Sequence, residues 1–475
     1  MSATSAPVAA GGRTATNPRL LAAVVATAFF VEQMDSTVLV TALPTITGEF
    51  DVNPVSGNLL LTSYLLTLTA FLPACGRLAD VFGIRRVFCA AMGVFTLASA
   101  LCSLADSMPM LIAARLLQGV GAAMMSPVGR LLLLRSVPKS ELVRVMSWVL
   151  IPTMIAPILG PLVGGFLVTY TSWRWIFWIN VPVGIAGVAL AWILVREPPG
   201  RPDPAPFDTV GALLCGLALS GLVVGMESFV HRVADWRFSL VAAGIGVAAA
   251  AGYLGHARRH AAPLLNLGLL RTRTFAIATG AGILFRIGIA AFPFLLPLML
   301  QLNFGMSALA SGAITFASGI SALVVKLTTV PILRHVGYRR VMIANGVLCA
   351  LFLALCAAFR PSWPLAALYA VMLLGGFVRS LQFNAFGTIA FADVPSNLMG
   401  DATSLHSVVQ QLAGVLGISV AAAVLIGTAA LRGASTPAPA DFSAALLLVA
   451  ACALWSAQIC TRLHADDGAE LSQIQ

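Results

Sequence analysis

The sequence predicts an all-α integral membrane protein with about fourteen membrane-spanning helices, and three observations predict it. First, 59% of the 475 residues are hydrophobic and 10% are charged, whereas a soluble domain carries about 25% charged residues. Lipid must therefore face most of the chain. Second, lipid-facing backbone must satisfy its own hydrogen bonds, which leaves helices or a closed barrel. Third, the apolar runs are roughly 20 residues or longer, which favours helices over the ten-residue strands of a barrel.

Fourteen apolar runs follow one another along the chain, each bounded by polar or charged residues. Their expected ranges are 20–43, 59–75, 87–105, 108–134, 142–170, 175–195, 210–230, 238–257, 275–302, 308–333, 341–359, 364–391, 402–430 and 442–461. The first run is long and lacks a clear cleavage site, so we interpret it as a retained helix and not as a signal peptide. An even number of spans places both termini on one side of the membrane.

The basic residues indicate which side that is. The net charge is +10, and of the 28 Lys and Arg residues nineteen lie at the termini or in loops on their side, five in the opposite loops and four inside spans. Because basic residues concentrate in cytoplasmic loops, we expect a multi-pass protein of the inner (plasma) membrane with both termini in the cytoplasm. The basic residues are scattered between apolar spans, so nucleic-acid binding is not expected.

Two polar breaks divide the spans into groups of six, two and six. Residues 196–207 are Pro-rich and charged, and a second break follows at 258–273. We therefore expect an N-terminal six-helix bundle in residues 1–195, a linker with two extra transmembrane helices in 196–273, and a C-terminal six-helix bundle in 274–475. A weak internal repeat supports this plan, because a Gly-x-Arg-Arg sequence follows the second helix of each six-helix group, at residues 83–86 and 337–340.

Residues 76–86 read G-R-L-A-D-V-F-G-I-R-R, which resembles the signature loop of the major facilitator superfamily, G-x-L-A-D-x-x-G-x-R-R. The resemblance implies the fold of that superfamily, with two six-helix halves in parallel repeat. Gly76 and Gly83 permit tight turns. Asp80 can cap a helix start and pair with arginines across the interface of the halves, and Arg85 and Arg86 complete the motif. The implied role is a conformational latch, not catalysis.

The expected fifth helix carries A-P-I-L-G-P-L-V-G-G at residues 156–165, which resembles the G-P-x-x-G-G motif of the superfamily's antiporters. Small residues let helix backbones approach closely, and prolines bend a helix. The residues that match the motif are Gly160, Pro161, Gly164 and Gly165. The position before them that is often Gly in the family is Ala156 here.

Residues 32–44 (E-Q-M-D-S-T-V-L-V-T-A-L-P) resemble the first-helix signature of the fourteen-helix drug:proton antiporters, the EmrB/QacA type. Residues 173–182 (W-R-W-I-F-W-I-N-V-P) resemble the start of that family's sixth helix, and 115–123 (R-L-L-Q-G-V-G-A-A) its fourth-helix motif. The resemblance spans essentially the whole chain and is nearest to the MdtD-like branch. It implies a proton-coupled, alternating-access exporter of drugs or other small organic molecules, monomeric and without a cofactor, driven by the proton gradient.

Charged residues inside the spans are the candidates for that chemistry, because a charge at the bilayer centre costs at least about 2.5–3.5 kcal/mol. Glu32 and Asp35 are three residues apart and share one helical face. At about 1.5 Å per residue, Asp35 lies roughly 22 Å from the inner end of its helix and Arg115 roughly 10 Å from the outer end of its own. Both fall at a similar depth, so an Asp35–Arg115 interaction is possible. We expect these three residues to couple transport to protons.

The second half has no deeply placed acid, but it has cations and other polar residues in its spans. We expect them to line a substrate cavity, and they are Arg286, Lys326, Arg379, Gln382, Asn384, His406 and Gln410. Two interpretations stay open at this point. The cations meet a substrate with an anionic or electron-rich group, or they neutralise Glu32 and Asp35 across the cavity.

A dedicated exporter of an organic anion or other metabolite is the alternative to a multidrug pump.

Functions other than transport find little support in the sequence. A membrane-embedded enzyme is not indicated, since the chain has no HExxH, nucleotide-binding loop or Cys/His cluster. The eight cysteines lie in or beside apolar spans without a CxxC pair, so we expect neither a metal site nor a disulfide framework. A sensor would need a large soluble output domain, for which the polar segments are too short.

Overall fold

The computed structural model describes residues 18–137, 139–195, 208–231, 235–260, 263–395, 398–434, 436–464 and 467. The side chain of Lys326 is among those that lie outside the described part of the structure. Within the described residues, fourteen helical segments are long and apolar enough to cross a membrane, and no strand occurs. The predicted all-α membrane fold with fourteen spans is confirmed.

The first six spans are built from twelve short and long helices. They are α1 (Pro18–Val38), η1 (Leu39–Ala42), α2 (Leu43–Glu49), η2 (Pro54–Gly57), α3 (Asn58–Phe71), η3 (Leu72–Ala74), α4 (Cys75–Phe82), α5 (Ile84–Ser103), α6 (Met108–Ser136), α7 (Lys139–Tyr170), α8 (Trp175–Trp178) and α9 (Asn180–Leu194). The inserted pair is α10 (Thr209–His231) and α11 (Trp236–Ala257). The last six spans, preceded by η4 (Leu267–Arg271), are α12 (Arg273–Leu302), α13 (Ala308–Val336), α14 (Tyr338–Ala357), α15 (Leu365–Ile389), α16 (Met399–Leu431) and α17 (Pro439–Cys460).

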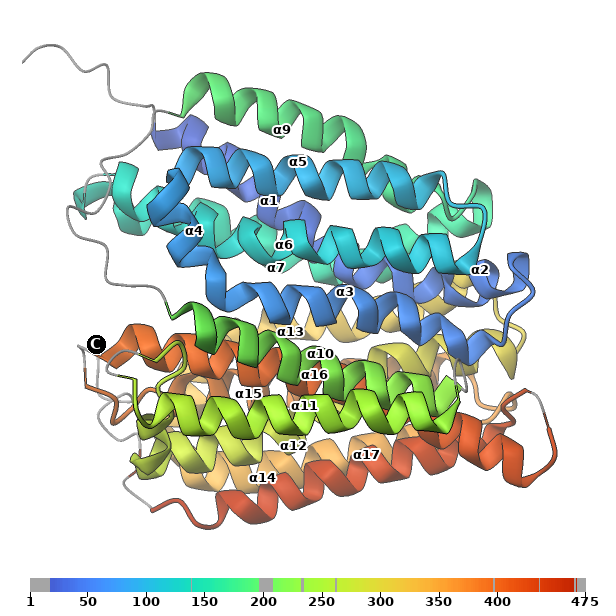
Figure 1. Ribbon diagram of the computed structural model, residues 1–475. Coiled ribbons are helices and arrows are strands. Elements are labelled where there is room, and N and C mark those ends of the chain that lie inside the picture. The colour runs from blue at the N-terminus through green and yellow to red at the C-terminus, as the bar shows by residue number, and fades with distance from the viewer. Residues whose placement is uncertain are drawn as a thin grey trace, which may run out of the picture.

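The helices form two bundles with the inserted pair beside the line where the bundles meet (Figure 1). In the first bundle α1 packs against α7 and α9, and α6 packs against α3 and α5; in the second, α12 packs against α16 and α17, and α13 against α15. The bundles meet along two seams, α7 with α13 and α3 with α16. Helix α10 contacts both α3 and α16, while α11 packs against α10.

The described chain begins and ends on one face of the molecule, which carries Pro18 and Cys460 and which we call the terminal face (Figure 1). The opposite face, which carries Glu49 and Ala308, we call the far face. One buried apolar cluster joins second-half residues to first-half residues of the far-face side, among them Leu43 and Trp173. First-half residues of the terminal-face side form a separate cluster. Among the described residues, the largest core that the two halves share therefore lies toward the far face, and a small cluster of Leu66, Val223 and Val415 also joins them.

Two glycines stand at equivalent places in the halves and have the same backbone conformation. Gly83, between α4 and α5, has φ 92° and ψ 137°, and Gly337, between α13 and α14, has φ 83° and ψ 149°. Residues with a Cβ rarely adopt positive φ, whereas glycine does so at little cost. The Gly-x-Arg-Arg repeat in the sequence thus corresponds to a shared sharp turn between two helices on the terminal face.

Small residues allow the α7–α13 seam to close near the far face. A Cβ added to Gly312 of α13 would lie 2.1 Å from the carbonyl oxygen of Pro161, and one added to Gly165 would lie 2.5 Å from that of Ala308. Real Cβ atoms do not come so close to backbone, so any larger residue would force the two helices apart. The G-P-x-x-G-G motif is therefore part of the contact between the halves.

We predict that Gly312→Ala destabilises the protein, because overpacking a tight contact costs about 1–3 kcal/mol. Gly414→Ala in α16 is the matched control, since a Cβ at Gly414 has no atom within 4 Å. Thermal unfolding in detergent should give a lower Tm for Gly312→Ala and a Tm at or above the wild-type value for Gly414→Ala. Equal Tm values for the two variants would contradict the assigned contact.

Candidate functional site

An ion pair between α1 and α6 lies fully inside the first bundle. Arg115 Nη1 donates to Asp35 Oδ2 at 2.6 Å, and both side chains are 0% exposed. The structure thus brings together the two residues for which the sequence allowed an interaction by depth alone. A buried ion pair of this kind is tolerated only where further hydrogen bonds satisfy its remaining polar atoms.

Two amide side chains supply those bonds to the carboxylate. Gln118 Nε2 and Asn180 Nδ2 both donate to Asp35 Oδ1, at 2.9 and 3.0 Å. Arg115, Gln118 and Asn180 all donate hydrogen bonds to Asp35, which is the pattern that an ionised carboxylate requires. Sequence reasoning did not assign a role to Gln118 or Asn180, although each lies in a motif that resembled the antiporter family.

The guanidinium of Arg115 is also held by two residues of α3 and by one of its own helix, α6. Its Nε donates to the carbonyl oxygen of Leu60 in α3 at 3.1 Å, its Nη1 also donates to Gln118 Oε1 at 2.6 Å, and its Cζ lies 4.3 Å from the ring centroid of Tyr64. Its Nη2 has no hydrogen-bond partner among the described residues. One nitrogen of this buried cation is therefore available for a new contact.

Glu32 lies one turn from Asp35, toward the terminal face. It accepts a hydrogen bond of 2.5 Å from Ser126 Oγ of α6, and the residue is buried. The two acids of α1 therefore face the same helix but have different partners, a hydroxyl for Glu32 and a guanidinium for Asp35.

A cavity of about 570 Å³ lies between the two halves. Among its lining residues are Gln33, Thr37, Tyr64 and Arg115 of the first half and Thr315, Ser318, Arg379, Phe383 and Asn384 of the second. The seams close it toward the far face, while its lining includes Leu323 and Phe383, which are 42% and 40% exposed. Leu323 lies at the middle of α13, and Phe383 lies on the part of α15 nearer the terminal face. The size of the cavity suits a drug-sized molecule.

The charged side chains that line this cavity are both cationic. They are Arg115 and Arg379, and no Asp or Glu occurs among the lining residues that the structure describes. Arg379 Nη2 donates to Ser318 Oγ at 3.4 Å, its Nη1 is buried without a hydrogen-bond partner, and its Cζ lies 5.2 Å from the ring centroid of Phe292. No ion pair of Arg379 with an acid occurs within the described residues. The second-half wall of the cavity thus carries an uncompensated positive charge.

The other expected cavity residues have varied surroundings. Arg286 does not line the cavity, but its Cζ lies 4.7 Å from the ring centroid of Phe383, which does. Gln382 is fully buried and turned to α14, where it accepts from Asn345 Nδ2 at 2.9 Å and donates to the carbonyl of Met342 at 3.0 Å.

Asn384 lines the cavity and lies 3.4 Å from Thr329 Oγ1. His406 and Gln410 are neighbours on α16, with 2.5 Å between His406 Nε2 and Gln410 Nε2. Neither residue lines the cavity. Two of the seven expected residues, Arg379 and Asn384, therefore line the cavity, and the side chain of Lys326 lies outside the described part of the structure.

The signature loop differs in detail from the expectation. Gly76 lies inside α4 and not in a turn, because the chain forms a further short helix after Ala74. Asp80 Oδ1 accepts from Arg135 Nη2 of α6 at 2.7 Å, so its partner belongs to the same half. The ion pair of Asp80 that the structure describes therefore lies within the first half and does not cross between the halves.

The two arginines of the loop have different surroundings. Arg85 donates to the carbonyl of Val195 at 3.2 Å and stacks on Trp192. Arg86 is exposed. Arg85 thus ties the start of α5 to the end of the first bundle.

The motif in α7 contacts both halves. A Cβ at Gly160 would lie 2.0 Å from Thr37 Oγ1, and one at Gly164 would lie 2.2 Å from the carbonyl oxygen of Val38, both on α1. Gly165 and Pro161 face α13. The motif thus packs α7 between the helix that carries Asp35 and the helix across the seam.

Glu227 is another buried acid, and it connects three elements. It is 6% exposed in α10 and accepts from Asn58 Nδ2 of α3 at 3.0 Å and from Ser419 Oγ of α16. The inserted helix thereby holds one residue of each half. Further contacts across the halves near the far face are Gln301 Nε2 to the carbonyl of Thr41 (3.0 Å) and Leu309 N to Thr169 Oγ1 (3.2 Å).

The chain belongs to the Major Facilitator Superfamily, which residues 25–418 match. The fold and the central cavity together with this match define a multi-pass membrane transporter and not an enzyme. The chain is 38% identical to a protein of Serratia proteamaculans over 430 residues, covering 89% of this chain and 88% of the relative. It is 37% identical to a protein of Salmonella newport over 407 residues, covering 85% of each. Both relatives are named multidrug resistance protein MdtD, a function that their names give as provisional.

Solved structures share the fold at low sequence identity. The POT family transporter PepTSo has a TM-score of 0.69 at 13% identity, covering 97% of this chain and 99% of that one. A D-xylose-proton symporter has a TM-score of 0.66 at 15% identity, covering 95% and 98%. These similarities establish the architecture and leave the substrate to be argued from the cavity.

We predict that Glu227→Ala loosens the far-face contact between the halves. Hydrogen bonds to charged groups contribute about 1.5–3 kcal/mol, so the ratio of closed to open molecules should fall at least about tenfold. In a variant with the eight native cysteines replaced, a disulfide between cysteines placed at Thr169 and Leu309 reports closure. Its yield should drop with Glu227→Ala.

Glu49→Ala is the matched control for this experiment. Glu49 also lies at the far face, but it accepts from Trp173 Nε1 and Arg174 Nη1, both in the first half. Its loss should leave the cross-linking yield unchanged. Equal yields for wild type and Glu227→Ala would show that Glu227 does not hold the halves together.

Proposed function

We propose that this protein is a proton-coupled exporter of small organic molecules or drugs, which works by alternating access across the bacterial inner membrane. Membership of the superfamily and the similarity to relatives named as multidrug resistance proteins support this proposal. The moving bodies would be residues 1–195 and 274–475, with 196–273 inserted between them. The excess of basic residues in the loops on the terminal face supports cytoplasmic termini.

The observation that carries the proposal is that Arg115 belongs to two sites. It is the ion-pair partner of Asp35 and also lines the central cavity. A proton that binds to Asp35 removes the charge that holds Arg115, so the guanidinium becomes free to change its contacts. Proton and substrate thus act on one side chain, which is what coupling requires.

The cycle follows from the contacts that must break and form. In the terminal-face-open state Asp35 is ionised and paired, and the substrate enters from the cytoplasm. Opening of the far face requires loss of the contacts of Gln301, Leu309 and Glu227 across the halves. After the substrate leaves, a proton from outside neutralises Asp35, with Glu32 as a second carrier nearby. The protonated transporter then returns and releases the proton inside.

An exporter selective for organic anions is the second candidate, and the charge of the cavity favours it. Arg379 lines the cavity with one unpartnered nitrogen, and Arg286 lies behind Phe383. Neither makes an ion pair with an acid in the described part of the chain. Neutralisation of Glu32 and Asp35 by these cations is therefore the weaker interpretation, since Asp35 already has Arg115. A carboxylate or other electron-rich group of the substrate would complete the site.

Asp35→Asn should abolish proton-driven efflux and leave membrane insertion intact, because an amide keeps the size of the side chain but cannot exchange a proton. Asp51→Asn is the control, an exposed acid on the far face without a role in the network. Efflux of a fluorescent drug from proteoliposomes against its gradient gives the readout. Transport by Asp35→Asn at the wild-type rate would transfer the coupling role to Glu32, for which Glu32→Gln is the next variant.

Arg379→Ala should weaken the binding of anionic ligands far more than that of cationic ones. Loss of a charged hydrogen bond of about 1.5–3 kcal/mol corresponds to a Kd at least about tenfold higher. The affinities of fluorescein, an aromatic carboxylate, and ethidium, a cation, should be measured across pH. Arg379→Lys should restore only part of the affinity for the anionic ligand, because lysine keeps the charge but lacks the planar fork of the guanidinium.

Arg286→Ala should act in the same direction as Arg379→Ala, and Arg360→Ala, an exposed far-face cation, should have no effect. If the cavity cations only balance Glu32 and Asp35, Arg379→Ala would shift the pH profile and affect both dyes equally.

A further inference from the structure

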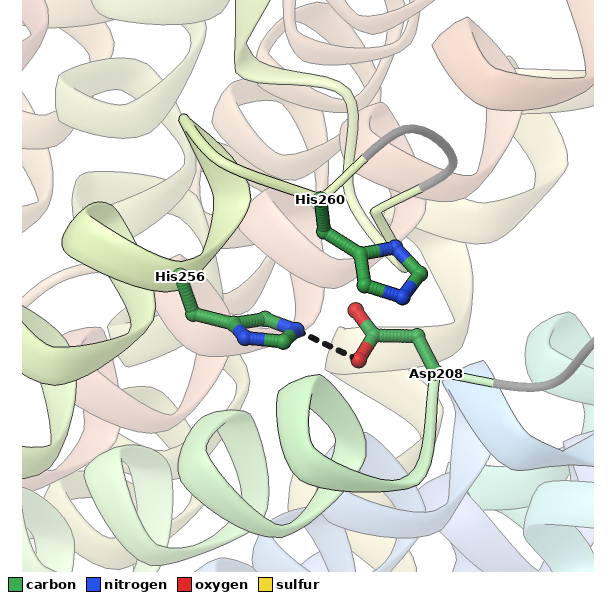
Figure 2. Close-up of side chains that lie close together, drawn as sticks. All are labelled: Asp208, His256 and His260. Atoms are coloured by element: carbon green, nitrogen blue, oxygen red, sulfur yellow. Dashed lines mark hydrogen bonds and ion pairs between the residues drawn. The ribbon is translucent and has the colours of Figure 1, made fainter.

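A cluster of one acid and two histidines lies on the terminal face, outside the transport machinery described above. Asp208 directly precedes α10, and His256 and His260 lie at the end of α11 and just beyond it. Their ligand atoms all lie within 4.8 Å of one another. Figure 2 shows the three side chains converging, with the carboxylate of Asp208 directed toward both rings.

The carboxylate of Asp208 is held in place by backbone amides. Gly211 N donates to its Oδ1 at 2.7 Å and Leu264 N to its Oδ2 at 3.1 Å, and its side chain is 3% exposed. Burial alone would raise the pKa of Asp208, but these amides and His256 outweigh burial and hold it below its usual value. The two amides thus fix the orientation of the carboxylate, as a metal ligand requires.

The two histidines are four residues apart, which places them on one side of a helical turn. The helical hydrogen bond from His260 N to the carbonyl of His256 (2.9 Å) continues the turn past the end of α11, and the ring centroids lie 5.0 Å apart. The end of a helix carries a partial negative charge that favours a cation. His256 Nε2 lies 2.6 Å from Asp208 Oδ1, and its side chain is 21% exposed, so solvent can reach the cluster.

We propose that Asp208, His256 and His260 form a binding site for a divalent transition-metal ion of the Zn²⁺ class. Imidazole nitrogens with one carboxylate are a common ligand set for such ions, and water would complete the coordination. The ion would take the place of the proton between His256 and Asp208. The ligand atoms would then move to about 3.3 Å from one another, the spacing that metal–ligand bonds of about 2.0–2.1 Å give in a tetrahedral site.

Binding would join three parts of the inserted segment. Asp208 begins α10, the histidines end α11, and Leu264, which donates to Asp208, lies in the connection to α12. A bound ion would therefore clip the two inserted helices together at the terminal face, while Glu227 holds α10 at the opposite end. This inference does not depend on the transported substrate or on proton coupling. Sequence inspection did not predict the site, because its ligands are 48 residues apart and one follows a Pro-rich stretch.

A simple His256–Asp208 ion pair is the competing interpretation, and Arg258 and Arg259, both exposed, add positive charge nearby. Metal binding to tag-free, full-length protein in detergent separates the two. Co²⁺ should bind at one ion per chain and give visible d–d absorption, and Zn²⁺ should displace it. His260→Gln removes one ligand and leaves the Asp208–His256 contact, so it should raise the Kd for Co²⁺ at least about tenfold. His256→Gln should do the same.

The matched control is His335→Gln, which removes a histidine on the same face whose hydrogen-bond partner in the described structure is the carbonyl of Pro331 in its own helix. It should leave the Kd and the spectrum unchanged. Absence of stoichiometric Co²⁺ binding to the wild type would overturn the proposal. So would binding that His260→Gln and His256→Gln leave intact. Neither readout involves transport, so the outcome is independent of whether the exporter function holds.

Discussion

The buried ion pair between Asp35 and Arg115 is the constraint on which the rest of the first bundle depends. Two charges without exposed surface are costly to bury unless hydrogen bonds and ring contacts from their neighbours compensate most of the lost hydration. Gln118, Asn180 and the carbonyl of Leu60 supply the bonds, and they come from α6, α9 and α3. Four helices are thereby fixed around one carboxylate, and a change in its charge must affect all of them.

The two halves are held together by contacts of a different kind. Near the far face they are joined by glycine-mediated backbone packing and by a few hydrogen bonds, and the largest core that they share also lies on that side. Such contacts can break and form without exposing a large core. Glu227 adds a charged contact to this seam from an inserted helix that a twelve-helix transporter would lack. The inserted pair thus takes part in holding one facing state.

The fold could be predicted from the sequence because lipid imposes span length and composition on each helix separately. The shared depth of Asp35 and Arg115 could be predicted for a similar reason, since the rise per residue is fixed. Rotation of a helix about its axis is set by its neighbours, and it could not be predicted. Gln382 therefore faces α14 although it follows Arg379 by three residues, and the partners of Glu227 depend on where α10 docks.

The central claim is that the proton acts on the facing state through Asp35. Distances between spin labels at positions 51 and 360, on exposed far-face loops of the two halves, report that state directly. The wild-type distance distribution should change with pH. Asp35→Asn should hold the distribution that the wild type has at low pH, at every pH. If the distribution for Asp35→Asn changes with pH as that of the wild type does, Asp35 is not the group through which the proton acts on the facing state.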